Sequence, residues 1–171
     1  MSTDESDTKT VADPTDPADS LKGVIVDGVV GAAGGFVGTA LMTVVLLIAQ
    51  GLGAFETASF ADLARLIALQ DVLGEGPLQA AGYLIFLAGG MTTWPLLFAS
   101  VEAYLPGGTM AQRGISFGTV LWTGFVIAFY AGQTGTALYL YVALTLVAHW
   151  VYGFGLGLVF TYFSTRPDTL V

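Results

Sequence analysis

The chain has 171 residues, of which 54% are hydrophobic and only 11% are charged, well below the roughly 25% typical of soluble domains. Its net charge of -8 disfavours nucleic acid as a partner, and the absence of cysteine excludes disulfides, thiolate metal sites and cysteine nucleophiles. Three stretches lack charge, 28–55, 76–101 and 114–165, and a helix needs roughly 20 apolar residues to cross a bilayer. The third stretch has room for two crossings. These features predict an all-α fold, a four-transmembrane-helix bundle.

Residues 1–22 are predicted to form a disordered acidic N-terminal tail, because they contain little that could be buried. The acidic composition with few lysines is typical of a halophilic archaeon, although disordered tails of other organisms are often acidic too. The first twenty residues hold six acids and one lysine: Asp4, Glu5, Asp7, Asp13, Asp16, Asp19 and Lys9.

The first span is expected at about 24–49, and the segment after it reads "SFADLARLIALQDVLG". Its apolar residues recur at helical spacing, but it is too short and too charged to cross a membrane. We expect a short amphipathic interfacial helix between spans one and two, the alternative being an ordinary exposed loop helix. Ser59 is a candidate N-cap, and Asp62 with Arg65 a candidate ion pair. The predicted apolar face comprises Phe60, Leu63, Leu66, Ile67 and Leu73.

The second span is expected at about 77–100, with Pro77 in its first turn and a kink at Pro95. A turn containing Glu102 and Arg113 then leads to the third span at about 115–131. The motif "GQTGT" at 132–136 predicts a hairpin into the fourth span at about 137–163. The transmembrane domain therefore covers 23–165, and 166–171 form a C-terminal tail.

Four spans place Lys9, Lys22, Arg113 and Arg166 on one side and Arg65 on the other. The positive-inside rule then predicts a multi-pass protein of the cell membrane with both termini in the cytoplasm.

Two stripes of small residues are candidate helix-packing surfaces, since small side chains let helices approach closely in lipid. In span one, Gly31 pairs with Gly35, and Gly34 pairs with Gly38. In span four, small or polar residues recur every four positions. We expect each stripe to meet a partner helix, one alternative being that the two stripes meet each other. The span-four stripe comprises Thr145, His149, Gly153 and Gly157.

His149 is the only histidine, and its place on this stripe points it toward a neighbouring helix. We interpret it as a structural hydrogen-bonding residue, with Thr145, Tyr152 or a threonine of span two as partner. Proton transfer and metal or haem ligation are the alternatives; haem would need a second copy of the histidine, or one of Met42, Met91 and Met110.

Asp27, near the start of span one, is a second candidate polar site. Its charge suits a helix N-terminus, and Lys22 is close in sequence, so we interpret it as an interfacial anchor.

No constellation for catalysis is present, such as a histidine pair for zinc, G-x-S-x-G or a phosphate loop. The sequence therefore predicts neither an enzyme nor a cofactor.

Three segments, "GGFVGTALMTVVLL", "ASFADLARLI" and "HWVYGFGLGLVF", resemble a group of small four-span membrane proteins of unknown function found in haloarchaea and some bacteria. The likeness covers about 24–163 and implies a membrane bundle without assigning active-site residues. Two functions remain open. One is a structural or accessory bundle docking on itself, as a homo-oligomer, or on a larger membrane complex; the other is a small oligomeric transporter or channel.

Overall fold

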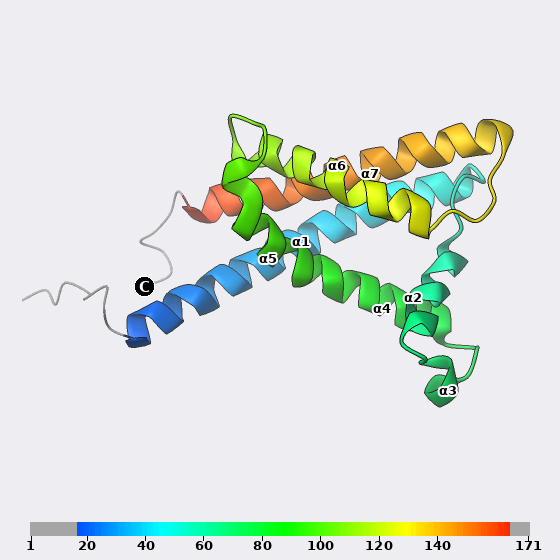
Figure 1. Ribbon diagram of the computed structural model, residues 1–171, viewed down its shortest axis with the longest axis horizontal. Coiled ribbons are helices and arrows are strands. Elements are labelled where there is room, and N and C mark those ends of the chain that lie inside the picture. Colours follow the sequence, from blue (N-terminus) through cyan, green and yellow to red (C-terminus); the bar gives the residue numbers. More distant parts are fainter. Residues whose placement is uncertain (1–16, 165–171) are drawn as a thin grey trace, which may run out of the picture.

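The computed structural model describes residues 17–164, and within them the side chains of residues 25–163 other than 27. Every regular element of this part of the chain is a helix, as predicted (Figure 1). The long helices are α1 (Pro17–Gly51), α4 (Leu78–Met91), α5 (Thr93–Val101), α6 (Met110–Ala128) and α7 (Gly135–Ser164). The short ones are η1 (Thr57–Ser59), α2 (Phe60–Leu66), α3 (Gln70–Leu73) and η2 (Glu102–Tyr104).

Three segments are long and apolar enough to cross a membrane, namely Gly28–Gly51, Leu78–Tyr104 and Gly135–Phe163. They indicate a multi-pass membrane protein. The predicted third span corresponds to α6, which has 19 residues but is not among these candidates. Gln112 and Arg113 in its first turn lower its mean hydropathy.

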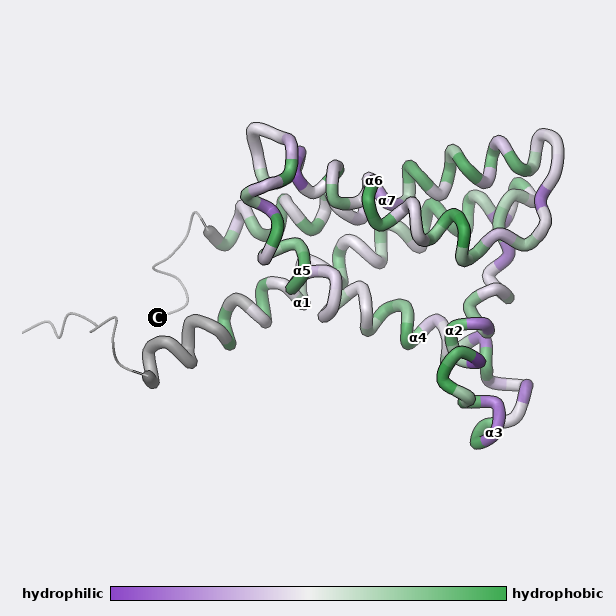
Figure 2. Tube along the Cα trace, viewed as in Figure 1, coloured by the Kyte–Doolittle hydropathy of each residue, from purple (hydrophilic) through white to green (hydrophobic). Residues whose placement is uncertain are grey.

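The long helices run roughly along one axis, with α7 packed against both α1 and α6 (Figure 1). The start of α1, the loop 105–109 and the end of α7 lie at one end of the molecule. The turn 129–134 and the segment 52–77 lie at the other end. Hydrophilic residues gather in these connections, whereas the helices between them are mainly hydrophobic (Figure 2). This distribution suits a molecule whose middle lies in lipid.

α1 is longer than the predicted span, since its 35 residues begin at Pro17. Residues 17–22, which we assigned to the acidic tail, are therefore helical. Proline suits a first helical turn because its missing N–H would have no partner there. The rest of the predicted tail, 1–16, and residues 165–171 with Arg166 lie outside the described residues.

The amphipathic segment forms two short helices, α2 and α3, where one was predicted. They are separated at Ala68, which has a φ of 57°. Of the predicted apolar face, Phe60 is buried in the bundle, whereas Leu66 is 81% exposed. Ala61 and Ala64 are buried instead, because small side chains let α2 pack closely on α4.

Polar contacts fix this segment. The predicted pair of Arg65 with Asp62 is present at 2.8 Å, and Arg65 also bonds Glu75 at 2.7 Å, which ties α2 to the start of α4. Ser59 is the N-cap residue of α2, as predicted, but its side chain makes no capping hydrogen bond, since η1 leads directly into α2.

The second span is interrupted between α4 and α5 at Thr92, whose φ of -120° and ψ of -68° are not helical. The cause lies three residues later. Pro95 has no N–H, so the carbonyl of Met91 loses its helical donor. The predicted kink is thus confirmed, with the distortion before the proline.

The connections before and after α6 agree with the predictions from the sequence. Glu102 and Arg113 form a half-buried ion pair that closes the connection from η2 to α6. In the hairpin between α6 and α7, Gly132 and Gly135 have φ values of 84° and 57°, which glycine adopts without strain.

A cluster of phenylalanine rings closes the end of the bundle near the turn 129–134. Phe125 and Phe129 stack with centroids 4.2 Å apart, and Phe60 of α2 packs edge-on against Phe129 at 5.5 Å. Phe55 and Phe86 complete the cluster. These rings link α2 and α4 to α6 at this end.

Candidate functional site

The small stripe of α7 packs against α6, where the two backbones nearly touch. A methyl group added at Gly153 would collide with the carbonyl oxygen of Gly114, and one added at Gly157 would collide with that of Met110. One turn along, a methyl group at Gly118 would collide with the carbonyl oxygen of His149. Glycine is therefore required for this crossing.

The stripe of α1 divides between two neighbours. A Cβ at Gly34 would lie 3.0 Å from the side chain of Leu156, and one at Gly38 would lie 2.7 Å from the Tyr152 carbonyl oxygen, both in α7. The two stripes therefore do not meet glycine to glycine.

The other glycines of α1 face the break in span two. A Cβ at Gly35 would collide with the Gly90 carbonyl and lie 2.7 Å from Cγ of Pro95. One at Gly31 would lie 3.3 Å from Cβ of Pro95. α1 thus packs against the break between α4 and α5 with one face and against α7 with another.

These contacts leave a cleft between α4 and α6, which do not pack closely against each other. Its volume is about 370 Å³, within the range of roughly 300–1,000 Å³ typical of ligand pockets. We call it the α4–α6 cleft. Its lining comprises Thr39, Met42, Leu63, Ile85, Phe86, Gly89, Gly90, Trp94, Leu121, Gly124, Phe125, Ala128, Phe129, His149 and Tyr152.

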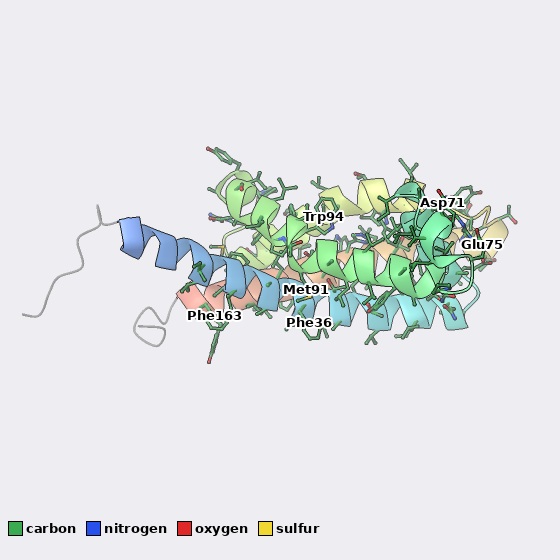
Figure 3. All side chains as sticks on the ribbon, turned by 90° about the horizontal axis from the view of Figure 1, so that it is seen from below. Phe36, Asp71, Glu75, Met91, Trp94 and Phe163 are labelled. Atoms are coloured by element: carbon green, nitrogen blue, oxygen red, sulfur yellow. The ribbon has the colours of Figure 1, made fainter. Side chains whose placement is uncertain are left out.

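The cleft has an exposed rim and a buried floor. Trp94, Gly124 and Ala128 are exposed, whereas Thr39 and His149 are buried. Trp94 and Met91 point to opposite sides of the break in span two (Figure 3). None of the lining residues is charged. The lining residues of span two run from Ile85 to Trp94, near its middle, and those of α6 run from Leu121 to Ala128, in its second half.

His149 is 4% exposed, and its ring packs edge-on against Phe125, 4.7 Å between centroids. Its Nδ1 lies 2.8 Å from the carbonyl oxygen of Thr145. Because a carbonyl oxygen only accepts, this bond requires the proton on Nδ1. In the neutral ring Nε2 is then an acceptor, and no hydrogen bond from the described residues reaches it.

Thr39 is 1% exposed, and its Oγ1 has no hydrogen-bond partner within the described part of the chain. Tyr152, by contrast, donates its hydroxyl to the carbonyl oxygen of Gly90 at 2.9 Å, which links α7 to the end of α4. Thr39 and His149 therefore each have one side-chain polar atom without a partner in the described chain, whereas the Tyr152 hydroxyl has such a partner.

The hydroxyl of Thr145 is fully engaged behind this floor. It accepts from Nε1 of Trp122 at 3.1 Å and donates to the carbonyl of Tyr141 at 2.6 Å. Of the candidate partners of His149, Thr145 makes the bond, through its main chain.

The structure brings His149, Thr145 and Tyr152 together but leaves the other candidates apart. The side chain of Asp27 lies outside the described residues. Met42 lines the cleft with His149, whereas Met91 and Met110 border a different groove near Glu102.

Sequence reasoning missed Thr39, Trp122 and the glycines of α6, Gly114 and Gly118. The last two stand four residues apart, as in the stripes of α1 and α7, which is the signal that could have identified them.

The arrangement can bind an uncharged, largely apolar molecule and offer it a few hydrogen bonds at the floor. No curated protein and no solved structure matches the chain. A family profile matches residues 25–171, which include all the described helices from early α1 onward. The chain belongs to the family of unknown function DUF6789.

Proposed function

We propose that this protein is a four-span, non-enzymatic accessory protein of the cell membrane, and that it functions by holding an apolar component of the bilayer in the α4–α6 cleft. The observation that carries the proposal is the cleft itself: an uncharged cavity of about 370 Å³ that opens between the middle of span two and the second half of α6.

α6 serves as the fourth span in this proposal. Its 19 residues rise about 28 Å at 1.5 Å each, close to the roughly 30 Å of the hydrocarbon core. It runs beside α7, and the loops at its two ends lie at opposite ends of the bundle (Figure 1). In this topology Arg113 lies on the same side as the termini and Arg65 on the other, so these two charges balance. The positive-inside rule favours cytoplasmic termini only when Lys9, Lys22 and Arg166 are counted as well.

Cysteine labelling tests this topology, because the chain has no cysteine of its own. Gly108 lies in the loop before α6, and Gly132 in the turn after it. With a membrane-impermeant maleimide applied to intact cells, Gly132→Cys should be labelled and Gly108→Cys should react only after lysis. Labelling of both variants from the same side would show that α6 does not cross.

The transporter or channel alternative is less well supported by this cavity. Paths for ions usually carry charged rings or backbone carbonyls, whereas the lining of the cleft is uncharged and mainly apolar. A bound apolar molecule needs no continuous aqueous path.

A plug variant tests occupancy of the cleft. A Cβ added at Gly124 meets nothing within 4 Å, so Gly124→Leu fills the opening without displacing backbone. Leu84, which is 63% exposed on α4 and does not line the cleft, supplies the control Leu84→Phe. The full chain is purified from native membranes into nanodiscs, and its organic extract is analysed by mass spectrometry.

An apolar compound should be enriched with the wild type and Leu84→Phe but not with Gly124→Leu. Identical extracts from all three proteins would overturn the proposal. A partner helix, from a second copy or a larger complex, is the competing occupant. It would appear as a protein adduct when Gly124→Cys is crosslinked in membranes, with no compound enriched.

A further inference from the structure

Two hydrogen-bonding atoms on the floor of the α4–α6 cleft have no partner in the described chain, and both belong to side chains more than nine-tenths buried. They are Oγ1 of Thr39 and Nε2 of His149. A buried polar group without a partner destabilises a fold, and lipid around the opening offers it no hydrogen bond. Such atoms therefore point to something that completes them.

The two atoms differ in what they can offer. The Nδ1 bond to the Thr145 carbonyl leaves Nε2 of neutral His149 as an acceptor only. The hydroxyl of Thr39 can donate or accept. The third polar group, the hydroxyl of Tyr152, already donates its proton to Gly90. The floor thus presents an acceptor that needs a donor, and its lining also includes a hydroxyl of either role.

We propose that the α4–α6 cleft recognises a lipophilic molecule by a hydroxyl group, which donates to Nε2 of His149. Oγ1 of Thr39 is covered by protein atoms, so it donates to the same hydroxyl only after its side chain turns toward the ligand. This inference rests on the proposed function and specifies the chemistry of the ligand. A carbonyl or an ether could satisfy Thr39 but would leave His149 without a donor. A cation would have to be desolvated beside an uncharged lining.

The remainder of the ligand is defined by the walls. Phe86, Phe125 and Phe129 line the cleft together with aliphatic side chains, so the body of the molecule is apolar, as in a long-chain alcohol or a quinol. Both carry the same recognised O–H group, and binding assays with a simple alkanol and with a quinol distinguish them.

Trp94 on the rim provides the readout. Full-length protein in detergent micelles is titrated with a brominated undecanol or with the matching bromoundecane, which lacks the hydroxyl, at equal mole fractions in the micelle. Bromine quenches the fluorescence of a nearby indole. The quenching that the wild type shows and Trp94→Phe does not therefore reports binding in the cleft. A second titration adds an unbrominated quinol as a competitor and tests whether a quinol binds in the same cleft.

Bromoundecanol should saturate at a concentration about tenfold lower than bromoundecane, the preference expected of one or two added hydrogen bonds. His149→Phe should abolish the preference, and His149→Gln, which offers an amide oxygen, should retain most of it. Thr39→Val, which replaces the hydroxyl by a methyl group of the same size, should weaken alcohol binding by roughly threefold to tenfold.

A failure of hydroxyl recognition can be distinguished from a failure of the proposed function. Equal saturation by both probes, or a preference that survives in His149→Phe, overturns hydroxyl recognition and leaves cleft occupancy intact. No saturable quenching with either probe overturns both the inference and the proposed function.

Discussion

The crossing of α6 and α7 gives the sharpest test of the structure, through the substitution Gly118→Ala. The added methyl group would collide with the main-chain oxygen of His149, which cannot move aside as a flexible side chain could. α6 and α7 would have to separate along a contact that also includes Gly114 and Gly153. Overpacking of this kind costs about 1–3 kcal/mol.

Gly124→Ala is the matched control on the same helix, since its methyl group meets nothing within 4 Å. Alanine favours a helix over glycine by about 0.8–1.0 kcal/mol, a gain that both variants share. The control should therefore be unchanged or slightly more stable than the wild type. Gly118→Ala should therefore be about 1–3 kcal/mol less stable than Gly124→Ala, and hence about 0–2 kcal/mol less stable than the wild type.

Unfolding in mixtures of a mild detergent and dodecyl sulfate, followed by far-ultraviolet circular dichroism, measures the difference. Tryptophan fluorescence adds a local probe, because Trp122 and Trp150 bond Thr145 and Thr119 across this crossing, at 3.1 Å and 2.9 Å. A Gly118→Ala protein as stable as Gly124→Ala, with unchanged fluorescence, would refute the close crossing.

Three further substitutions test the floor and its supports in the same unfolding assay. Thr39→Val should stabilise the ligand-free protein by about 1–3 kcal/mol, since it removes a buried hydroxyl without a partner; lower stability would reveal a hidden partner. Tyr152→Phe should cost about 1 kcal/mol through the lost bond to Gly90, and an unchanged protein would show that this bond contributes nothing. Gly35→Leu should prevent close packing against Pro95 and destabilise more strongly than either, unlike Gly51→Leu, whose Cβ meets no other atom.

The sequence predicted the helices because hydrophobic length and breaker residues are local signals. Pro95 predicted the break in span two, and Gly132 and Gly135 predicted the hairpin. The division of the amphipathic segment at Ala68 was not predictable in this way, because alanine rarely adopts a positive φ and tertiary contacts decide whether it does.

The pairing of the small stripes was beyond the sequence for a different reason. Glycines four residues apart identify a helix surface but carry no information about which helix covers it. Gly153 could have met Gly34 as readily as Gly114, and only the folded arrangement distinguishes them. The same holds for Thr39, whose unused hydroxyl cannot be recognised until all its neighbours are known.

The cleft stays open because lipid gives helices no hydrophobic reason to close it: an apolar side chain facing acyl chains gains little from facing another helix. Contacts that do fix positions lie at the edges, where Gly35 meets the break at Pro95 and where α2 and the phenylalanine cluster hold α4 near its start. α4 is thereby fixed near both ends, and its contact with α6 is limited to the rings of the phenylalanine cluster, such as Phe86 on Phe125. Closure would require these end contacts to shift, so the width of the cleft is determined by glycine packing on α1 at one end and by the phenylalanine cluster at the other.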